Sequence, residues 1–152
     1  ATEPYPVDPT LRARVLRARG RARLLRGRLD DALLDYRRAR EHVSTGPLGA
    51  ALTADIGVVH HQQRALDEAM DLYESALAGL AGSEALRLQA RIMGNIGAVR
   101  HDRGQYDEAI THYRRALGLF AEVGDRRLEG IFWPIWGWWS SNSIGGKTLG
   151  FT

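Results

Sequence analysis

Histidines are the residues of this chain whose types and spacing first suggest chemistry. His60 and His61 are adjacent, and His101 occupies the position of His61 in a later, similar segment, which raises the question of a metal site. Adjacent residues point in different directions on a helix, and no set of carboxylates completes the ligand shell. No nucleophile lies beside a candidate base either. The sequence therefore predicts no metal site, no cofactor and no catalytic residue, so the protein is not expected to be an enzyme.

The stretch Gly-Gly-Lys-Thr at 145–148 matches the end of a phosphate-binding loop. That loop also needs a glycine at position 141, which is Ser141 here, and a strand before it. A chain that is helical throughout would supply no such strand. We therefore interpret this stretch as unrelated to nucleotide binding.

Arginines dominate residues 12–28, RARVLRARGRARLLRGR, where eight of the 17 residues are Arg. Such a segment could contact the phosphates of a nucleic acid. However, Asp30, Asp31 and Asp35 follow directly and would neutralise part of the charge, and no aromatic residues are interleaved for base stacking. A GC-rich genome would also favour Arg, which supplies all the basic residues except Lys147. The favoured interpretation is a solvated helix face; nucleic-acid binding is the alternative, and an acidic protein partner is a further one.

Composition indicates a soluble protein with one domain. The chain has 152 residues, of which 44% are hydrophobic and 26% are charged. The net charge of +3 is uneven, because residues 1–43 hold eleven Arg and six acidic residues. Cysteine is absent, which excludes disulfides and thiolate sites. No apolar run is long enough to span a bilayer and the N-terminus does not resemble a signal peptide, so we expect a cytoplasmic protein with no membrane association.

The chain contains an internal repeat. Residues 13–40, 50–77 and 90–117 align without gaps, with spacings of 37 and then 40 residues. Each segment shows apolar residues at helical spacing on both sides of a turn, which predicts a helical hairpin. The positions shared by all three segments are Gly20, Gly57 and Gly97; Ala32, Ala69 and Ala109; Tyr36, Tyr73 and Tyr113; and Ala39, Ala76 and Ala116.

The hairpins predict six helices, and a short seventh helix that starts after residue 125 and stops before Pro134. In the third hairpin, Gly104 is expected to end the first helix in a left-handed conformation. Gly97 should allow the two helices of the hairpin to approach closely, whereas Tyr113 should face the neighbouring hairpin. The six expected ranges are 10–25, 29–43, 48–63, 66–80, 85–102 and 106–122.

These residues resemble the tetratricopeptide repeat. The third segment matches best, with Asn-Ile-Gly at 95–97 and Gly-Gln-Tyr-Asp-Glu-Ala at 104–109. The second segment has Arg64 where the turn glycine is usual, and the first has Arg19 and Arg23 where large apolar residues often lie. The resemblance covers residues 11–130 and implies an all-α fold, an α-solenoid in which three hairpins and the short C-terminal helix stack into a superhelix. The 40-residue spacing is similar to the longer repeats of large bacterial regulators.

The resemblance also implies a domain division and a binding face. Residues 1–9 would be a linker, 10–130 the repeat domain with repeats at 13–46, 50–83 and 90–125, and 131–152 a tail. The first helices would line a concave groove that holds a peptide or protein segment, so the expected function is a non-catalytic interaction scaffold in a larger bacterial signalling or transcription regulator. The inward positions are Arg14, Arg17, Arg21, Asp55, Val58, His61, Gln62, Arg91, Asn95, Ala98, His101 and Asp102. The family's carboxylate-clamp pattern is met only in part, because Asp55 replaces an Asn and the Lys positions are not filled by Lys.

The tail has a different composition, because residues 131–143, IFWPIWGWWSSNS, hold all four Trp. The repeat period places the glycine of a fourth repeat at Gly137, yet Pro134 would interrupt that helix. The codons of this stretch, read one nucleotide earlier, allow F-L-A-N-L-G-L-V-E-Q, which restores Asn-Leu-Gly at 135–137. We therefore hypothesise that a single-nucleotide deletion near codon 133 truncated a longer array. Sequencing the encoding DNA tests this, and a GAT codon in the shifted Pro–Ile overlap would count against it.

A truncated array would leave the apolar face of its last hairpin uncovered. Aromatic and apolar residues near that end are then expected to cap the face or to drive self-association into a homo-oligomer. Membrane-interface binding is the alternative for the Trp cluster, but its glycines and the lack of basic flanks oppose an amphipathic helix. The residues expected to cap or self-associate are Phe120, Ile131, Phe132, Trp133, Trp136, Trp138 and Trp139.

Overall fold

The computed structural model of this protein describes residues 7–124, which form helices and their connecting turns. The helices are α1 (Pro9–Leu25), α2 (Leu29–His42), α3 (Gly46–Gln62), α4 (Leu66–Ala78), α5 (Leu86–Asp102) and α6 (Tyr106–Val123). Every expected boundary lies within two residues of the observed one, so the prediction of an all-α protein with three hairpins is confirmed. The expected seventh helix, the tail at 131–152 and most of the N-terminal linker lie outside the described residues.

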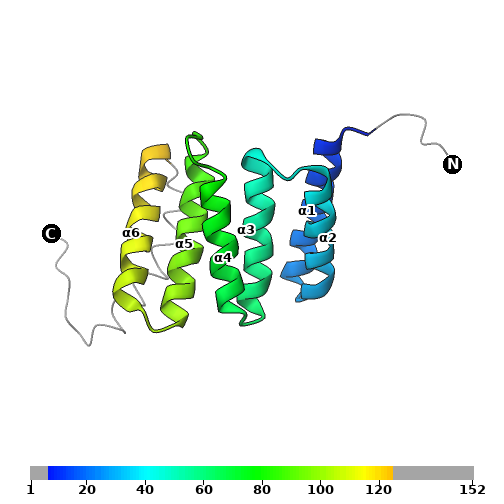
Figure 1. Ribbon diagram of the computed structural model, residues 1–152. Coiled ribbons are helices and arrows are strands. Elements are labelled where there is room, and N and C mark those ends of the chain that lie inside the picture. The colour runs from blue at the N-terminus through cyan, green and yellow to red at the C-terminus, as the bar shows by residue number, and fades with distance from the viewer. Residues whose placement is uncertain (1–6, 125–152) are drawn as a thin grey trace.

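The helices stand side by side in a row, with α1 and α2 at one end and α5 and α6 at the other (Figure 1). Each hairpin packs on the next, because α2 contacts α3 and α4 contacts α5. Among the first helices, α3 packs along α5 and Arg17 of α1 contacts Asp55 of α3, whereas in residues 7–124 the second helices α2, α4 and α6 do not pack extensively along one another. The face formed by α1, α3 and α5 is therefore the inner face of the stack. None of the helices described here is long and apolar enough to cross a membrane.

The turn inside each hairpin uses a left-handed residue. These residues are Gly27, Arg64 and Gly104, with φ of 74°, 63° and 74°. In the third hairpin the amide of Gly104 donates to the carbonyl of His101 at 2.9 Å, and the next amide donates to the carbonyl of Arg100 at 2.9 Å. The other two turns repeat this pattern. Gly104 thus ends α5 as predicted, while Arg64 adopts the same conformation despite carrying a side chain.

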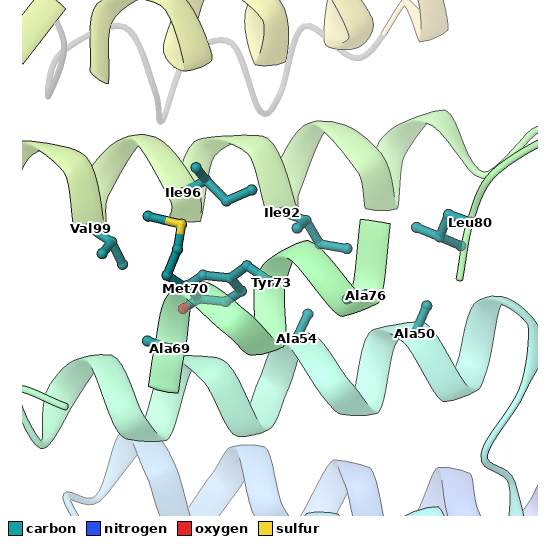
Figure 2. Close-up of a cluster of buried hydrophobic side chains, with 10 residues drawn as sticks. All are labelled: Ala50, Ala54, Ala69, Met70, Tyr73, Ala76, Leu80, Ile92, Ile96 and Val99. Carbon is teal, nitrogen blue, oxygen red and sulfur yellow. The ribbon is translucent and has the colours of Figure 1, made fainter. Parts of the chain in front are cut away.

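The core lies between hairpins, as the cluster around Tyr73 shows (Figure 2). Tyr73 is fully buried and lies in one cluster with Ala54 of α3 and with Ile92 and Ile96 of α5. Burial of such side chains is the main favourable contribution to stacking one hairpin on the next. The expectation that the shared tyrosine faces the neighbouring hairpin therefore holds for Tyr73.

The shared glycines allow the two helices of each hairpin to approach closely, as expected, and the structure shows which side chain covers them. A Cβ atom on each glycine would lie within 2.6 to 2.8 Å of Cε1 of a tyrosine ring, closer than side chains tolerate. Each glycine thus makes room for the tyrosine on the second helix of its own hairpin. The three pairs are Gly20 with Tyr36, Gly57 with Tyr73, and Gly97 with Tyr113.

The end of the stack formed by α1 and α2 carries charge where the other hairpins carry apolar side chains. Ile56 and Ile96 pack against the preceding hairpin, and Arg19 occupies their position in α1. Arg19 forms a two-point contact with Asp35, with Nη2–Oδ1 and Nε–Oδ2 distances of 2.7 and 3.0 Å. Arg23 adds a third contact at 2.8 Å, and the Asp35 side chain is fully buried. The two arginines that depart from the repeat pattern thus form an ion-pair network that gives this end of the stack a polar face.

Candidate functional site

A charged network crosses the inner face and joins all three hairpins. Asp55, in the middle of α3, accepts from Nε of Arg17 on α1 at 2.5 Å and from Nη2 of Arg91 on α5 at 3.2 Å. The Asp55 side chain is only 8% exposed. A carboxylate buried to this extent needs such partners, because an unpaired charge there would be strongly destabilising. The repeat places the three residues side by side although 36 and 38 residues separate them in sequence.

Positive charge exceeds negative charge around Asp55. Arg21 lies one helical turn after Arg17 on the same face of α1, and among residues 7–124 it has no hydrogen-bonding or ion-pair partner. Burial, together with the like charges of Arg17 and Arg21, lowers the pKa of Arg91, although the charge of Asp55 opposes this. The guanidinium of Arg91 is therefore held where its charge is costly. The network is set up to gain from a further anion.

Two tyrosine hydroxyls lie buried near these charges. The Tyr36 and Tyr73 hydroxyl oxygens have no hydrogen-bond partner among the described residues. Burial raises the pKa of Tyr36 to about 12, and the charge of Asp55 adds to the rise while those of Arg21 and Arg17 oppose it. The pKa of Tyr73 is raised as well, again chiefly by burial. Both rings thus lie beneath the charged network and close to it.

A pocket of about 740 Å³ opens beside the network. One side is cationic, with Arg17, Arg21 and Arg91, and Arg87 and Glu84 add charges from the start of α5 and the turn before it. The remaining wall is largely apolar and comes from the first turns of α3 and α5 and the end of α6. Its apolar lining residues are Pro47, Leu48, Ala51, Ala85, Leu86, Leu88, Phe120 and Val123. A pocket of this size and composition suits a few side chains of a bound molecule.

A second charged cluster occupies the other end of the inner face. Asp102 of α5 accepts from Nε2 of His61 and from Nη1 of Arg64, each at 2.8 Å. His101 contacts the same carboxylate at 3.5 Å and also approaches the ring of Tyr106. Burial works to raise the pKa of Asp102, but the His61 hydrogen bond and the nearby positive charges outweigh it and lower the pKa. In the described part of the chain, no three His or acidic residues are grouped so as to hold a metal ion.

The remaining predicted groove residues do not join either cluster. Arg14 and Gln62 are exposed, and Val58 packs partly into the core between α3, α4 and α5. Asn95 and Ala98 lie half-buried on α5 between the two ends. The predicted face therefore divides into a cationic pocket at one end and a carboxylate-centred cluster at the other.

The apolar residues that line the pocket carry no signal in the sequence. Leu48 and Leu88 lie in the first turns of α3 and α5, outside the alignable core of the repeat, and no shared position marked them. The sequence predicts Phe120 to cap the end of the array. It is 1% exposed, clusters with Ala90 and Ala116, and also lines the pocket. The other expected cap residues, 131–139, lie beyond the described part of the chain.

The arginine-rich helix is partly neutralised. Arg17, Arg19, Arg23 and Arg28 each form an ion pair with an aspartate. Half of the eight arginines in residues 12–28 are thus committed to carboxylates of the same chain. This weakens the case for a continuous phosphate-binding stripe along α1.

Comparisons with known proteins agree with this architecture. Family models described as tetratricopeptide repeat match residues 17–85 and 84–123, which together take in all three hairpins. The crystal structure of MamA is similar in fold, with a TM-score of 0.59, 21% sequence identity and coverage of 78% of this chain. This chain spans 63% of the MamA chain, which is less than two thirds of it. A search among curated proteins finds no match. Three stacked hairpins with the shared Gly, Ala and Tyr positions place this chain in the tetratricopeptide repeat family.

Proposed function

We propose that this protein is a non-catalytic scaffold that binds a segment of a partner protein on its inner face. Tetratricopeptide repeats generally mediate protein–protein interactions. The observation that supports the site is the pocket of about 740 Å³, which Arg17, Arg21 and Arg91 line together with apolar side chains. Adjacent polar and apolar surfaces can fix the orientation of a bound segment and also exclude water from it.

The pocket is lined mainly by helical residues whose charged side chains are held by contacts, which favours binding. Its charged residues lie on α1 and α5, and Asp55 fixes Arg17 and Arg91 relative to each other. Arginines already held in place lose less side-chain entropy when a ligand arrives. The inner face is therefore organised before binding rather than assembled by it.

Nucleic-acid binding has weaker support, because four of the arginines on and beside α1 pair with aspartates. A duplex or single strand would need a run of uncommitted cations and, for single strands, exposed aromatic platforms. Binding of the full chain to mixed-sequence DNA or RNA, with an affinity that falls steeply as salt rises, would favour this alternative.

Selection from a peptide library, followed by photo-crosslinking, tests the proposal. A photo-reactive residue replaces the exposed Val123 at the rim of the pocket or, as the control, the exposed Arg37 on α2. Selected peptides should crosslink at position 123 and not at position 37, and Leu88→Arg should weaken their binding because it fills the pocket. Crosslinking at position 37 alone, or binding that Leu88→Arg leaves unchanged, would contradict an inner-face site.

The setting of the scaffold is also part of the proposal. We place the repeats in the cytoplasm, within a larger bacterial signalling or transcription regulator. The assignment to a larger regulator is supported by the 40-residue spacing of the repeats and by the Asn-Leu-Gly triplet that the shifted reading frame allows at 135–137. The DNA sequence of the encoding locus tests this, because further repeats in the shifted frame should follow codon 133.

A further inference from the structure

We infer that the segment bound in the pocket is acidic, with a side-chain carboxylate next to an apolar residue, and that Asp55 limits how tightly it binds. This inference rests on the proposed function and adds the chemistry of the partner. Three features of the pocket carry it: an excess of cations, guanidinium donors that Asp55 does not use, and an apolar wall beside them.

The first feature is the excess of positive over negative charge in the pocket. Arg17, Arg21 and Arg91 line one pocket, and Asp55 is the carboxylate that pairs with two of them. Glu84 contributes a further negative charge, but it is exposed and lies in the loop before α5. A partner segment that brings a carboxylate would balance the remaining charge, whereas a basic segment would add to the repulsion.

The second feature is the set of guanidinium N–H donors that Asp55 leaves unused. A guanidinium carries five N–H donors, and Asp55 engages only Nε of Arg17 and Nη2 of Arg91. Arg21 is unpaired in residues 7–124. Charge-assisted hydrogen bonds to carboxylates are stronger than neutral ones, and Arg can make two in parallel. The pocket therefore offers several donors to an incoming carboxylate, and Arg21 is the one whose donors are all available.

The third feature is the group of apolar side chains that line the pocket beside the arginines. Leu48, Ala51, Leu88 and Phe120 line the same pocket as the arginines. A carboxylate alone would leave this wall in contact with water. An apolar residue beside the acidic one would bury against it and add affinity in proportion to the area covered.

The position of Asp55 determines whether the bound carboxylate belongs to a side chain or to a chain terminus. It lies between Arg17 and Arg91, the two guanidiniums that could otherwise grip one chain-terminal carboxylate from both sides. A carboxylate that reached this point would meet the charge of Asp55. We therefore assign the ligand to side-chain carboxylates within a segment, which reach Arg21 and the outer donors of Arg17 without displacing Asp55.

Fluorescence anisotropy with short labelled peptides tests this on the full chain. The main probe alternates Glu and Leu and is acetylated and amidated, so that it carries only side-chain carboxylates. Matched probes replace Glu by Gln or by Lys, and one Gln probe keeps a free C-terminal carboxylate. The Glu probe should bind at least about tenfold more tightly than the capped Gln probe, because it gains charge-assisted hydrogen bonds, and the Lys probe should be weakest.

Substitutions in the pocket test whether the Glu probe binds there. Arg21→Gln should weaken the Glu probe about tenfold, while Arg37→Gln, the same change on the outer surface of α2, should have no effect. Asp55→Asn should tighten the Glu probe several-fold, because the gain from removing a repelling charge and releasing donors of Arg17 and Arg91 exceeds the entropy lost when these two side chains are held less firmly. Asp71→Asn on the exposed face of α4 is its control. Arg21→Gln keeps the test valid even if Asp55→Asn disrupts folding, because Arg21 is exposed and has no partner among residues 7–124.

The outcomes separate the inference from the proposed function. Equal binding of the Glu and capped Gln probes, both weakened by Leu88→Arg, would overturn the acidic ligand and leave the inner-face site intact. Tight binding of the uncapped Gln probe alone would assign the site to a chain terminus and overturn the side-chain assignment. Binding that neither Arg21→Gln nor Leu88→Arg changes would overturn both.

Discussion

The ring of Tyr73 lies so close over Gly57 that a Cβ atom there would sit 2.7 Å from Cε1 of the ring. Tyr73 is fully buried and also clusters with Ile92 and Ile96 of the following hairpin. The same ring therefore closes its own hairpin and supports the next one. This relationship explains why a helix-breaking residue stands in the middle of α3.

Gly57→Ala should destabilise the protein. Alanine favours a helix over glycine by about 1 kcal/mol, but overpacking a tight core contact costs typically 1–3 kcal/mol. We expect a net loss of about 1 kcal/mol in the free energy of unfolding, measured by urea denaturation. A second substitution of Tyr73 by Leu should make the alanine tolerable, so the two changes should cost less together than the sum of their separate effects.

Gly118→Ala is the matched control, because Gly118 lies within α6 and a Cβ there meets nothing within 4 Å. It should raise stability by up to about 1 kcal/mol from helix propensity alone. If both alanine variants were equally stabilising, the tyrosine contact would not be the reason for Gly57.

The sequence alone could predict the hairpins and their register, because helical periodicity and the shared Gly, Ala and Tyr positions are local signals. It could not show what each glycine contacts. The alignment places Gly57 and Tyr73 at fixed repeat positions, but which side chain covers a glycine depends on the packing angle between two helices. The predicted role of Gly97, to allow close approach of the two helices of its hairpin, is therefore confirmed, but its contact with Tyr113 was not predicted.

Arg64 is the clearest local departure from the repeat. It adopts φ of 63°, where Gly27 and Gly104 stand in the other hairpins. The left-handed conformation costs a non-glycine residue roughly 1–2 kcal/mol, and its ion pair with Asp102 is a surface contact worth about 0–1 kcal/mol. Arg64→Gly should therefore raise the stability by up to about 1 kcal/mol, measured as a higher unfolding midpoint in urea.

The reverse exchange supplies the control for this prediction. Gly104→Arg places a side chain at φ of 74° without a compensating contact, so it should lower stability by about 1 kcal/mol or more. A loss of stability in Arg64→Gly would instead show that the contact with Asp102 outweighs the backbone strain. In that case the loss should disappear when Asp102 is already Asn.

The network around Asp35 predicts strong coupling. Asp35→Leu removes a fully buried carboxylate that both Arg19 and Arg23 contact, but these two side chains are 48% and 25% exposed and can be solvated, so the loss should be about 1–3 kcal/mol. The triple variant Arg19→Ile, Arg23→Leu and Asp35→Leu should recover part of this loss, because no polar group is then left without its partner. Urea denaturation of the single and triple variants measures the difference, and a triple variant no more stable than Asp35→Leu would contradict this account.

The site was predictable only in part. The repeat register placed Arg17, Asp55 and Arg91 on the inner face, because inward positions recur with the period. That Asp55 pairs with both arginines follows from side-chain lengths across three helices, which no local pattern encodes. Leu48 and Leu88 belong to helix starts and Phe120 to a helix end, where the three segments no longer align, so the apolar wall carried no sequence signal.

The buried hydroxyl of Tyr36 makes the stability of the folded protein depend on pH in the alkaline range. Its hydroxyl is buried without a partner among the described residues, and burial raises its pKa to about 12 from an ordinary value of 10.0. A raised pKa means that the folded state favours the neutral phenol. The resulting stability is complete below about pH 10 and is lost as the pH rises through 12.

Tyr36→Phe removes the unpaired hydroxyl, so the free energy of unfolding should rise by about 1 kcal/mol at neutral pH and should fall less than that of the natural protein near pH 11. Urea denaturation at both pH values checks this, and a phenylalanine variant that is less stable at neutral pH would show that the hydroxyl has a stabilising partner.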